Sequence, residues 1–483
     1  MMRWQRAFKR PRWPLQIPPP LAKWVIATII VVCIIPVASF IGAKLNQAPY
    51  KISPRPIPSQ ALLDDAALVR LGPRPDVKQD WQRDIAARQM PIRSLFSDDF
   101  SDLQFLKPLL KDKRLVMLGE SSHGVAEYNW MKTRLVRFLH REVGFDVLAF
   151  EGSMTGSYFV DKELGSKTAG QSLRNAVFGT WWTEEVQDTF EYLRAARQQG
   201  NPLTLAGFDI QNSSTHASTS AANLFKKMLA SLESPLLARV DEVEKALSDA
   251  YLSPSPSAQE VSEVASFYQQ VLDALNAKRL RLETVFMAEP SLVSLTLQEV
   301  QSRIKLAEML SLKTRDPKRS NDVRDAAMAA NLNFLMDKMY PNRKVIVWAH
   351  NAHTGAGYPW HGAWQGVKGM GAWIAETRKA ETYSIGLFMG KGGQVTNAWT
   401  RQVITFTTLL EPNTLEGVMA STKRKMSFVD FSQARPTTGN DWMFTPIDVK
   451  DWGTMPIKLV PRNVFDAVLY IDDVTPPKYL VNQ

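Results

Sequence analysis

Several short apolar runs in the chain lack the alternation of polar and apolar residues that marks a half-buried strand. They cover Leu115–Leu118, Asp146–Phe150, Leu203–Ala206 and Lys344–Ala349, with later candidates at Tyr383–Phe388 and Ala467–Ile471. Such runs are typical of parallel strands that are covered by helices on both faces. We therefore expect an α/β fold with a mainly parallel central sheet flanked by helices.

Between the third and fourth of these runs, the pattern changes to helical periodicity. The expected helices cover Ala221–Leu247, Ala258–Met287, Ser294–Leu312 and Asn321–Met339, with breaks at residues 253–256 and 289–290. An insertion of this length, about residues 215–340, does not fit within a simple crossover between strands. We expect it to stand over the carboxyl edge of the sheet as a helical cap that shapes a substrate cleft.

The first 80 residues have a different pattern from the rest of the chain. Residues 1–23 are basic, residues 24–43 contain no charged residue, and residues 44–80 are rich in proline. The 20 uncharged residues are enough for a helix to span a bilayer, and the basic flank places the N-terminus in the cytoplasm. The pattern predicts a single-pass protein of the inner (plasma) membrane, with a transmembrane helix, a proline-rich tether and a periplasmic or extracellular domain at residues 81–483.

A cleaved signal peptide is the alternative for the apolar segment, because Ile41-Gly42-Ala43 resembles a cleavage site. The run is longer than the apolar core of a typical signal peptide, which favours a retained anchor. Pro36 would kink the helix, and membrane-spanning helices tolerate such a kink.

Charge and cysteine content narrow the classes of function. The formal net charge is +10, and six basic residues lie in the first 23 positions, where there is no acid. The basic balance is mostly a terminal feature, so it does not indicate a nucleic-acid partner. Cys33 is the single cysteine, which excludes an intramolecular disulfide and a zinc site built on cysteines.

Candidate chemistry follows four of the expected strands. The first strand runs into Gly119, after which Glu120 and His123 lie on a short loop before a helix. Ser121 or Ser122 is expected to cap that helix. Polar side chains follow the other strands at Glu151, Asp209, His350, Asn351 and His353. Because the carboxyl ends of parallel strands meet at one edge of a sheet, we expect a convergent site there.

A series of motifs follows one another along these elements. They are Leu118-Gly-Glu-Ser-Ser-His-Gly124, Glu151, Gly207-Phe-Asp-Ile-Gln211, Arg324-Asp-Ala-Ala-Met-Ala-Ala-Asn331, Trp348-Ala-His-Asn-Ala-His353, Lys368-Gly-Met-Gly371 and Phe465-Asp-Ala-Val-Leu-Tyr-Ile471. In order and spacing, this set resembles the erythromycin esterase family over about residues 90–480. Each motif alone is weak, whereas the ordered set is fairly specific for the family and much less specific for the substrate.

The resemblance implies a hydrolase that opens an ester or macrocyclic lactone by attack of water, rather than through a serine acyl-enzyme. It places the first motif histidine on His123, the following acid on Glu151, and the histidine pair on His350 and His353. Some members of the family are associated with polysaccharide biosynthesis. The predicted anchor and tether depart from the soluble members that inactivate antibiotics, so the antibiotic substrate stays open.

The candidate residues match the needs of ester hydrolysis, which are a base that titrates near neutral pH, a group that orients it, and donors for the developing oxyanion. Histidine has a suitable intrinsic pKa, so we expect His123 to be the base. Glu120 or Glu151 would orient the base or the water. His350 and His353 would donate to the carbonyl oxygen or share proton transfer.

Other polar residues are candidates for substrate contact. The resemblance implies a basic residue in the helix after the first histidine, and both Lys132 and Arg134 are candidates for it. The full set of expected substrate-binding residues is Lys132, Arg134, Asp209, Asn351 and Arg324. Asp209 is equally suited to a hydrogen bond within its loop. Arg324 and Asp325 are suited to a structural role as a pair on one helix. The Trp181-Trp182 pair is more typical of a core than of a sugar-binding surface.

A divalent metal ion that acidifies a bound water is the main mechanistic rival. Its ligands would come from Glu120, His123, Glu151, His350 and His353. The chain contains no H-E-x-x-H motif, and we expect no cofactor. A serine nucleophile fits less well, because Ser121 and Ser122 lack a G-x-S-x-G elbow.

The sequence therefore predicts a membrane-anchored ester or lactone hydrolase that acts on a small-molecule ester or a glycoside-bearing substrate. The alternative is a non-catalytic envelope binding protein associated with polysaccharide biosynthesis. The joint presence of the five catalytic candidates favours the enzyme, whereas histidines that point into separate packed regions would favour the alternative. The oligomeric state is not predicted.

Overall fold

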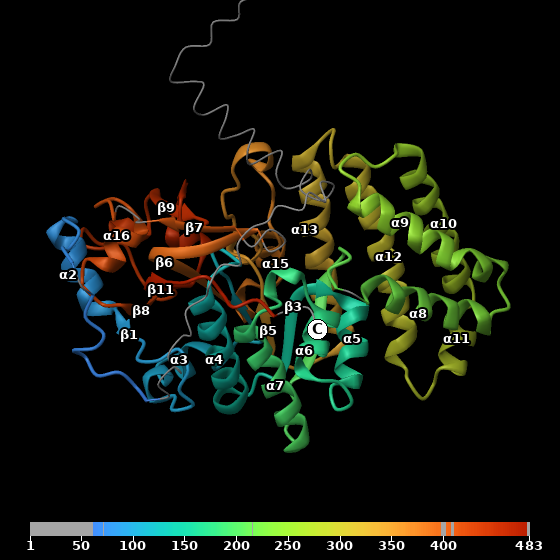
Figure 1. Cartoon of the computed structure of the whole chain (residues 1–483), viewed down its shortest axis with the longest axis horizontal. Coiled ribbons are helices and arrows are strands. Elements are labelled where there is room, and N and C mark those ends of the chain that lie inside the picture. Colours follow the sequence, from blue (N-terminus) through green and yellow to red (C-terminus); the bar gives the residue numbers. More distant parts are fainter. Residues whose placement is uncertain (1–60, 71, 215, 398–401, 407–409, 481–483) are drawn as a thin grey trace, which may run out of the picture. The chain divides into compact units, whose positions relative to one another are not determined.

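A computed structural model describes residues 61–70, 72–214, 216–397, 402–406 and 410–480 (Figure 1). The predicted cytoplasmic segment, transmembrane helix and first part of the tether lie outside these ranges, so they and the predicted localisation stay predictions. Within the described ranges, no helix combines the length and the apolar character needed to cross a bilayer. The later part of the tether packs on the domain, where Leu68 is buried and Arg70 pairs with Asp472 (Nε to Oδ1, 2.7 Å).

Nine strands of the described residues form one sheet in the order β1-β8-β11-β6-β2-β5-β3-β4, with β7 paired to β6. Their bounds are Met90–Pro91 (β1), Leu115–Leu118 (β2), Val147–Ser153 (β3), Thr204–Asp209 (β4), Val345–Trp348 (β5), Thr382–Asn397 (β6), Gln402–Phe406 (β7), Met426–Asp430 (β8) and Ala467–Val474 (β11). The strands from β11 to β4 along this order are parallel, and the antiparallel pairs lie at β1, β7 and β8. The expected α/β fold with a central sheet is confirmed, and each expected strand is present.

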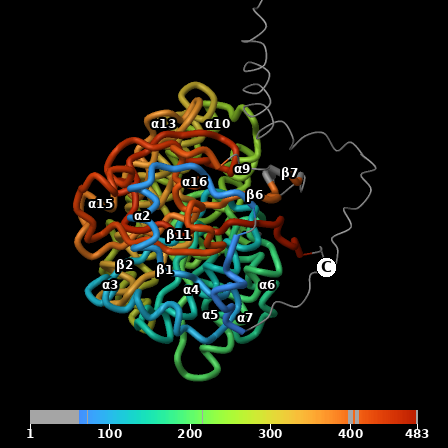
Figure 2. The backbone as a smooth tube through the Cα atoms, turned by 90° about the vertical axis from the view of Figure 1, so that its left-hand side faces the viewer, coloured from blue at the N-terminus to red at the C-terminus, as the bar shows by residue number. Residues whose placement is uncertain are grey.

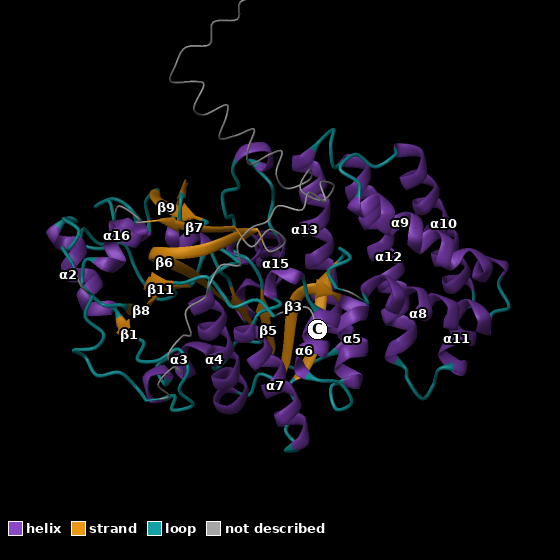
Figure 3. Ribbon diagram, in the orientation of Figure 1, coloured by secondary structure: helices purple, strands orange, loops and turns teal. Residues whose placement is uncertain are grey.

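Helices lie on both faces of the sheet (Figure 3), and the cores that they form with it explain the apolar runs in its central strands. In β2, Leu115 and Met117 enter one core, while Val116 and Leu118 enter the other. Strands β3 and β5 alternate between the two cores in the same way. Because neither face of these strands meets water, the residues that enter the two cores are apolar and the alternation disappears.

Different helices cover the two faces. The helices are Gln79–Arg88 (α2), Leu106–Leu110 (α3), Ala126–Val143 (α4), Met154–Glu163 (α5), Ala169–Ala176 (α6), Glu184–Gln198 (α7), Ala217–Ser231 (α8), Val240–Leu252 (α9), Ala258–Ala277 (α10), Arg279–Val285 (α11), Ser291–Leu312 (α12), Pro317–Phe334 (α13), Asn351–Thr354 (α14), Met370–Arg378 (α15), Leu415–Ala420 (α16) and Pro461–Val464 (α17). Residues of α3, α4, α6 and α7 form one core with the sheet. Residues of α8 to α10, α12, α13 and α15 form the other.

The helical insertion is present, with more breaks than the periodicity predicts. The single helix expected over Ala221–Leu247 is wrong, because α8 ends at Ser231 and α9 begins at Val240. A positive φ at Glu233 and the proline that opens the 3-10 turn Pro235–Arg239 interrupt it. The helix expected over Ala258–Met287 likewise divides into α10 and α11.

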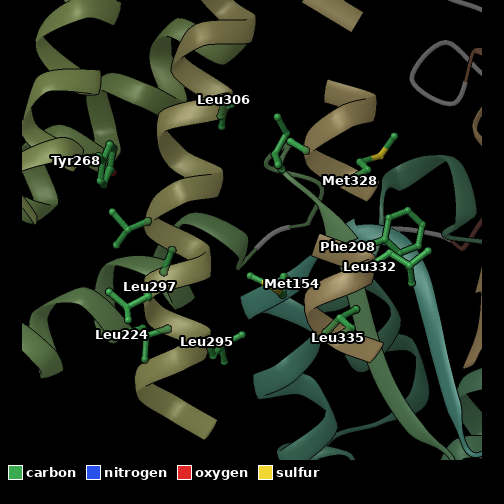
Figure 4. Close-up of a cluster of buried hydrophobic side chains, with 14 of the residues drawn as sticks. Met154, Phe208, Leu224, Tyr268, Leu295, Leu297, Leu306, Met328, Leu332 and Leu335 are labelled. Atoms are coloured by element: carbon green, nitrogen blue, oxygen red, sulfur yellow. The ribbon is translucent and has the colours of Figure 1, made fainter. Parts of the chain in front are cut away.

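The insertion packs onto the sheet edge that contains β4. Leu224 of α8 and Leu295 of α12 share one core with Met154 of α5, Phe208 of β4 and Met328 of α13 (Figure 4). Of these helices, α13 is the one that supplies a side chain to the site described below.

The C-terminal third contains strands that the sequence pattern did not reveal. Strand β8 joins the sheet, and Ile447–Asp451 (β9) pairs with Met455–Leu459 (β10) in a separate antiparallel hairpin. The first elements of the described chain lie against this region. Helix α2 contacts α16 (Figure 2), and β1 pairs with β8. The hairpin was missed because Pro456 argues against a strand and its residues alternate between buried and exposed positions over only a few residues.

Gly119 allows the end of β2 to approach its neighbours closely. Its backbone N donates to Ile385 O (2.9 Å). A Cβ at this position would lie 2.6 Å from Thr354 Oγ1 and still nearer to Asn351 Oδ1. The loop that carries Glu120 and His123 therefore starts from a position where only glycine fits.

The substitution Gly119→Ala should lower the free energy of unfolding by about 2 kcal/mol, because α14 or the loop must move to admit the methyl group. Urea denaturation measures this change. Gly165→Ala is the matched control, since a Cβ at Gly165 meets no atom within 4 Å. Equal stability of the two variants would show that the close approach is not a constraint.

Candidate active site

The polar residues predicted to converge do lie at one edge of the sheet. They come from neighbouring strands: Glu120 and His123 follow β2, His350, Asn351 and His353 follow β5, Glu151 lies near the end of β3, and Asp209 ends β4. Hydrogen bonds and ring contacts then divide them into two charged clusters joined by His350.

Glu120 is the centre of the first cluster. It is fully buried, and its Oε1 lies 2.7 Å from His123 Nδ1, while Oε2 accepts from Lys132 Nζ (2.7 Å). Trp181 Nε1 also donates to Oε1 (3.0 Å). Burial alone would raise the pKa of Glu120, but Lys132 and His123 outweigh it and lower the pKa below its ordinary value. The ionised carboxylate holds Nδ1–H of His123 and leaves the lone pair on Nε2.

The exposure of His123 fits the role of a base. Its side chain is 19% exposed, whereas that of Glu120 is inaccessible to solvent. The imidazole can therefore meet a water or a substrate while the carboxylate that orients it cannot. His123 also contacts the ring of Trp181 edge-on, with centroids 4.9 Å apart.

The two basic candidates on α4 have different environments. Lys132 Nζ contacts Glu120 and donates to Ala349 O (3.0 Å), and burial, opposed by Glu120, lowers its pKa to about 8. Arg134 instead makes a bidentate contact with Asp102 and bonds carbonyl groups of residues 94–99. Two residues subtend about 200° on a helix, so Arg134 faces away from the cluster and the expectation that it contacts substrate does not match its position.

Arg324 of α13 is the centre of the second cluster. Its Nη2 donates to Asp209 Oδ2 (2.6 Å) and Glu151 Oε1 (2.7 Å), and its Nη1 lies 3.2 Å from His353 Nε2. Burial would raise the pKa of Glu151, but His353 and Arg324 hold it well below its usual range. Asp209 Oδ1 also accepts from Arg324 Nε (3.2 Å) and from the backbone N of Gln211 (3.1 Å), so this carboxylate fixes both Arg324 and its own loop.

His353 is held from its other side by Asp325, whose Oδ1 lies 2.7 Å from Nδ1. Burial lowers the pKa of His353, but Asp325 and Glu151 outweigh it and raise the pKa above its ordinary value. This carboxylate also accepts the backbone N–H of Met370 (2.8 Å). Asp325 therefore positions the imidazole and connects it to the start of α15.

His350 links the two clusters. Its backbone N donates to Glu151 Oε2 (3.2 Å), and its Nδ1 accepts from the backbone N of Ala352 (3.2 Å). The ring centroid is 5.0 Å from that of His123. Burial is the main cause that lowers the pKa of His350 to about 4. At neutral pH the ring is uncharged and carries its proton on Nε2, for which the described residues provide no acceptor.

Asn351 supports the loops. Its Nδ2 donates to Leu387 O (3.1 Å), and its backbone N donates to Glu120 O (2.8 Å). The serine residues after Glu120 also differ from expectation, because α4 is capped at Val125 without a side-chain bond. Ser121 Oγ instead bonds Tyr128 OH (2.9 Å).

Two tryptophans contribute contacts that the sequence did not assign. Trp181 is buried as expected of a core residue, yet its N–H bonds Glu120. Trp452 lies on the β9–β10 turn and stacks on His350, with centroids 5.1 Å apart and planes inclined by 26°. No local pattern signals Trp452, because its proximity depends on the position of the whole hairpin.

The predicted metal alternative has no preformed ligand set in the described ranges, where no group of three or more His, Cys, Asp and Glu side chains is arranged to hold an ion. The two central carboxylates have cationic partners, Lys132 and Arg324. The absence of a cofactor stays a prediction.

Fold and site together define an α/β protein with a histidine–carboxylate site at the carboxyl edge of its sheet. A profile described as Erythromycin esterase matches residues 140–474. This range is more than half of the chain, and the chain belongs to the erythromycin esterase family.

Individual proteins resemble the chain to different extents. "Putative hydrolase YbfO" of Bacillus subtilis (strain 168) is 28% identical over 409 residues, which is 82% of this chain and 91% of that protein. "Erythromycin esterase type II" of Escherichia coli is 26% identical over 137 residues, which is 27% of this chain and 31% of that protein.

Solved structures share the fold at low identity. A Bacillus cereus protein aligns with a TM-score of 0.71 and 21% identity, covering 83% of this chain and 98% of its own. A succinoglycan biosynthesis protein gives a TM-score of 0.68 at 17% identity over 85% of this chain and 100% of its own. A mutant of erythromycin esterase EreC in an open conformation gives 0.64 at 18% identity over 80% of this chain and 96% of its own.

A buried acid lies behind the hairpin that carries Trp452. Glu416, at the start of α16, is fully buried, and its Oε1 accepts from the backbone N of Lys450 (2.8 Å). The other oxygen, Oε2, has no partner among the described residues. Burial raises the pKa of Glu416 from 4.5 to about 7.

Because this folded-state pKa lies above the value in the unfolded chain, the contribution of Glu416 to stability is present at low pH and is lost as the pH rises from about 4.5 to about 7. The glutamine of Glu416→Gln stays neutral at both pH values. The free energy of unfolding of this variant, relative to that of the wild type, should therefore be about 2 to 3 kcal/mol higher at pH 8 than at pH 5. Urea denaturation at both pH values measures this. Glu411→Gln, at an exposed position, is the control, and a pH-independent difference for Glu416→Gln would contradict the prediction.

Proposed function

We propose that the chain is an ester or lactone hydrolase in which His123 Nε2 takes a proton from an attacking water. The observation that carries the proposal is the bond between Glu120 and His123 Nδ1 (2.7 Å), which leaves Nε2 as the basic atom of a partly exposed ring. Lys132 keeps the carboxylate ionised, so Glu120 stabilises the imidazolium that forms.

The second imidazole supplies the complementary donor. As the water oxygen bonds to the carbonyl carbon, negative charge develops on the carbonyl oxygen. We assign this role to neutral His350, whose ring lies beside that of His123 and whose buried Nε2–H has no acceptor among the described residues. Glu151 and Arg324 hold the loop that carries His350.

The reaction closes with both atoms and charges balanced. When the tetrahedral intermediate collapses, the carbon–oxygen bond to the alcohol breaks, and the His123 imidazolium returns its proton to the leaving oxygen. The products are a carboxylic acid and an alcohol, together one water heavier than the substrate. Pairing of Glu120 with Lys132 and of Glu151 with Arg324 supports a route that uses histidine without a metal ion.

The names of relatives support this class of reaction. One relative is named "Erythromycin esterase type II" and another "Putative hydrolase YbfO". Macrolactones are therefore the first substrates to test, with simple esters beside them. We place the reaction outside the cytoplasm, on a domain anchored by residues 24–43, because the basic flank precedes that apolar segment.

Substitution of His123 by alanine in the full chain should lower kcat by about 10³-fold, because the base is removed. The measurement is the turnover of a panel of macrolides and simple esters, with product mass as the readout for the gain of one water. His216→Ala, at an exposed position on the same chain, is the matched control.

Loss of the product in His123→Ala alone would support the proposal. Equal turnover by both variants would remove His123 from the chemistry. No product from any ester with the wild-type chain would instead favour the non-catalytic, polysaccharide-associated role.

A further inference from the structure

The turn between β9 and β10 places a tryptophan in an unfavourable backbone conformation. Asp451 pairs with Met455, and the turn between them contains Trp452 with φ of 51° and Gly453 with φ of 68°. Glycine adopts a positive φ freely, whereas a large side chain there costs about 1 to 2 kcal/mol. Tryptophan at this position therefore needs an explanation other than turn formation.

Contacts from distant parts of the chain hold this turn in place. The backbone N of Trp452 donates to Ser121 O (2.9 Å), on the loop between Glu120 and His123. Gln394 Nε2 donates to the carbonyl of Trp452, and Tyr358 OH donates to Asp451 Oδ1 (2.8 Å). The position of the indole is thus determined by the same loop that carries the base.

The indole contacts both imidazoles of the site. It stacks on His350, and it meets His123 edge-on with centroids 5.6 Å apart and planes inclined by 86°. Trp452 remains partly exposed. One side of the indole therefore belongs to the wall of the site, beside the atoms assigned to base and oxyanion donor.

We propose that Trp452 is a substrate-positioning residue that packs against an apolar ring face of the substrate, such as an alicyclic or sugar ring next to the scissile bond. This inference rests on the proposed hydrolase function and names a preference of the same site. The charged side chains can orient a carbonyl group but offer little apolar surface, whereas an indole presents a large flat surface to C–H groups. Such packing directs the ester carbonyl toward His123 and His350.

The experiment compares two esters of equal carbon number, cyclohexyl acetate and n-hexyl acetate, on the full-length chain. Trp452→Asn removes the indole and suits a positive φ, so the hairpin should keep its thermal stability. Trp452→Phe keeps an aromatic face. For Trp452→Asn, the ratio of kcat/KM for the cyclic ester to that for the linear ester should fall about tenfold, mainly through KM, and Trp452→Phe should restore most of it.

A merely structural role for Trp452 would change thermal stability, or would lower both esters equally, and either result would overturn the proposal. Binding of cyclohexyl methyl ketone and 2-octanone, which cannot be hydrolysed, provides a second measurement by ligand-observed NMR. If the wild type hydrolyses neither ester, the proposed function fails. A preference for the cyclic ketone that disappears in Trp452→Asn would still support Trp452 as a surface that binds an apolar ring. Equal binding of the two ketones by the wild type would reject it.

Discussion

The compensation of the buried Glu120 charge is the interaction on which the site depends. A carboxylate without solvent is stable as an ion only when donors surround it. Here the donors are His123 on the same loop, Lys132 on α4 and Trp181 before α7. Each donor belongs to a different packed element, so the carboxylate joins these elements and also sets the tautomer of His123. The local stability and the proposed chemistry have the same physical origin.

The second cluster has a buried cation at its centre, where the first has a buried anion. Arg324 is a buried cation, and Asp209 and Glu151 compensate it. His350 lies between the two clusters, in which Lys132 compensates Glu120 and Arg324 compensates Glu151. Burial lowers the pKa of His350 and keeps its ring uncharged. The site therefore contains an imidazole bonded to a carboxylate on each side, His123 with Glu120 and His353 with Asp325, and the neutral ring of His350 between them. This arrangement suits separate acid–base and oxyanion roles.

Much of the fold followed from local pattern, because the strands β2 to β5 are buried on both faces and their apolar runs show it directly. Helix α12 also lies close to its expected range, and it packs against both α10 and α13. Local pattern failed where single residues change the backbone. A positive φ at Glu233 divides one expected helix, and Pro456 concealed the β9–β10 hairpin because proline is unusual inside strands.

The sequence by itself determined that these polar side chains share one edge of the sheet. Glu120, Glu151, Asp209, His350 and His353 lie at or just beyond the carboxyl ends of parallel strands, and such ends meet at one edge. Only the tertiary structure decided how they pair. It selected Lys132 over Arg134, assigned Asp325 to His353, and brought Trp452 onto His350. These choices depend on packing between segments far apart in the chain, and the geometry of such contacts leaves no periodic signal in the residues that make them.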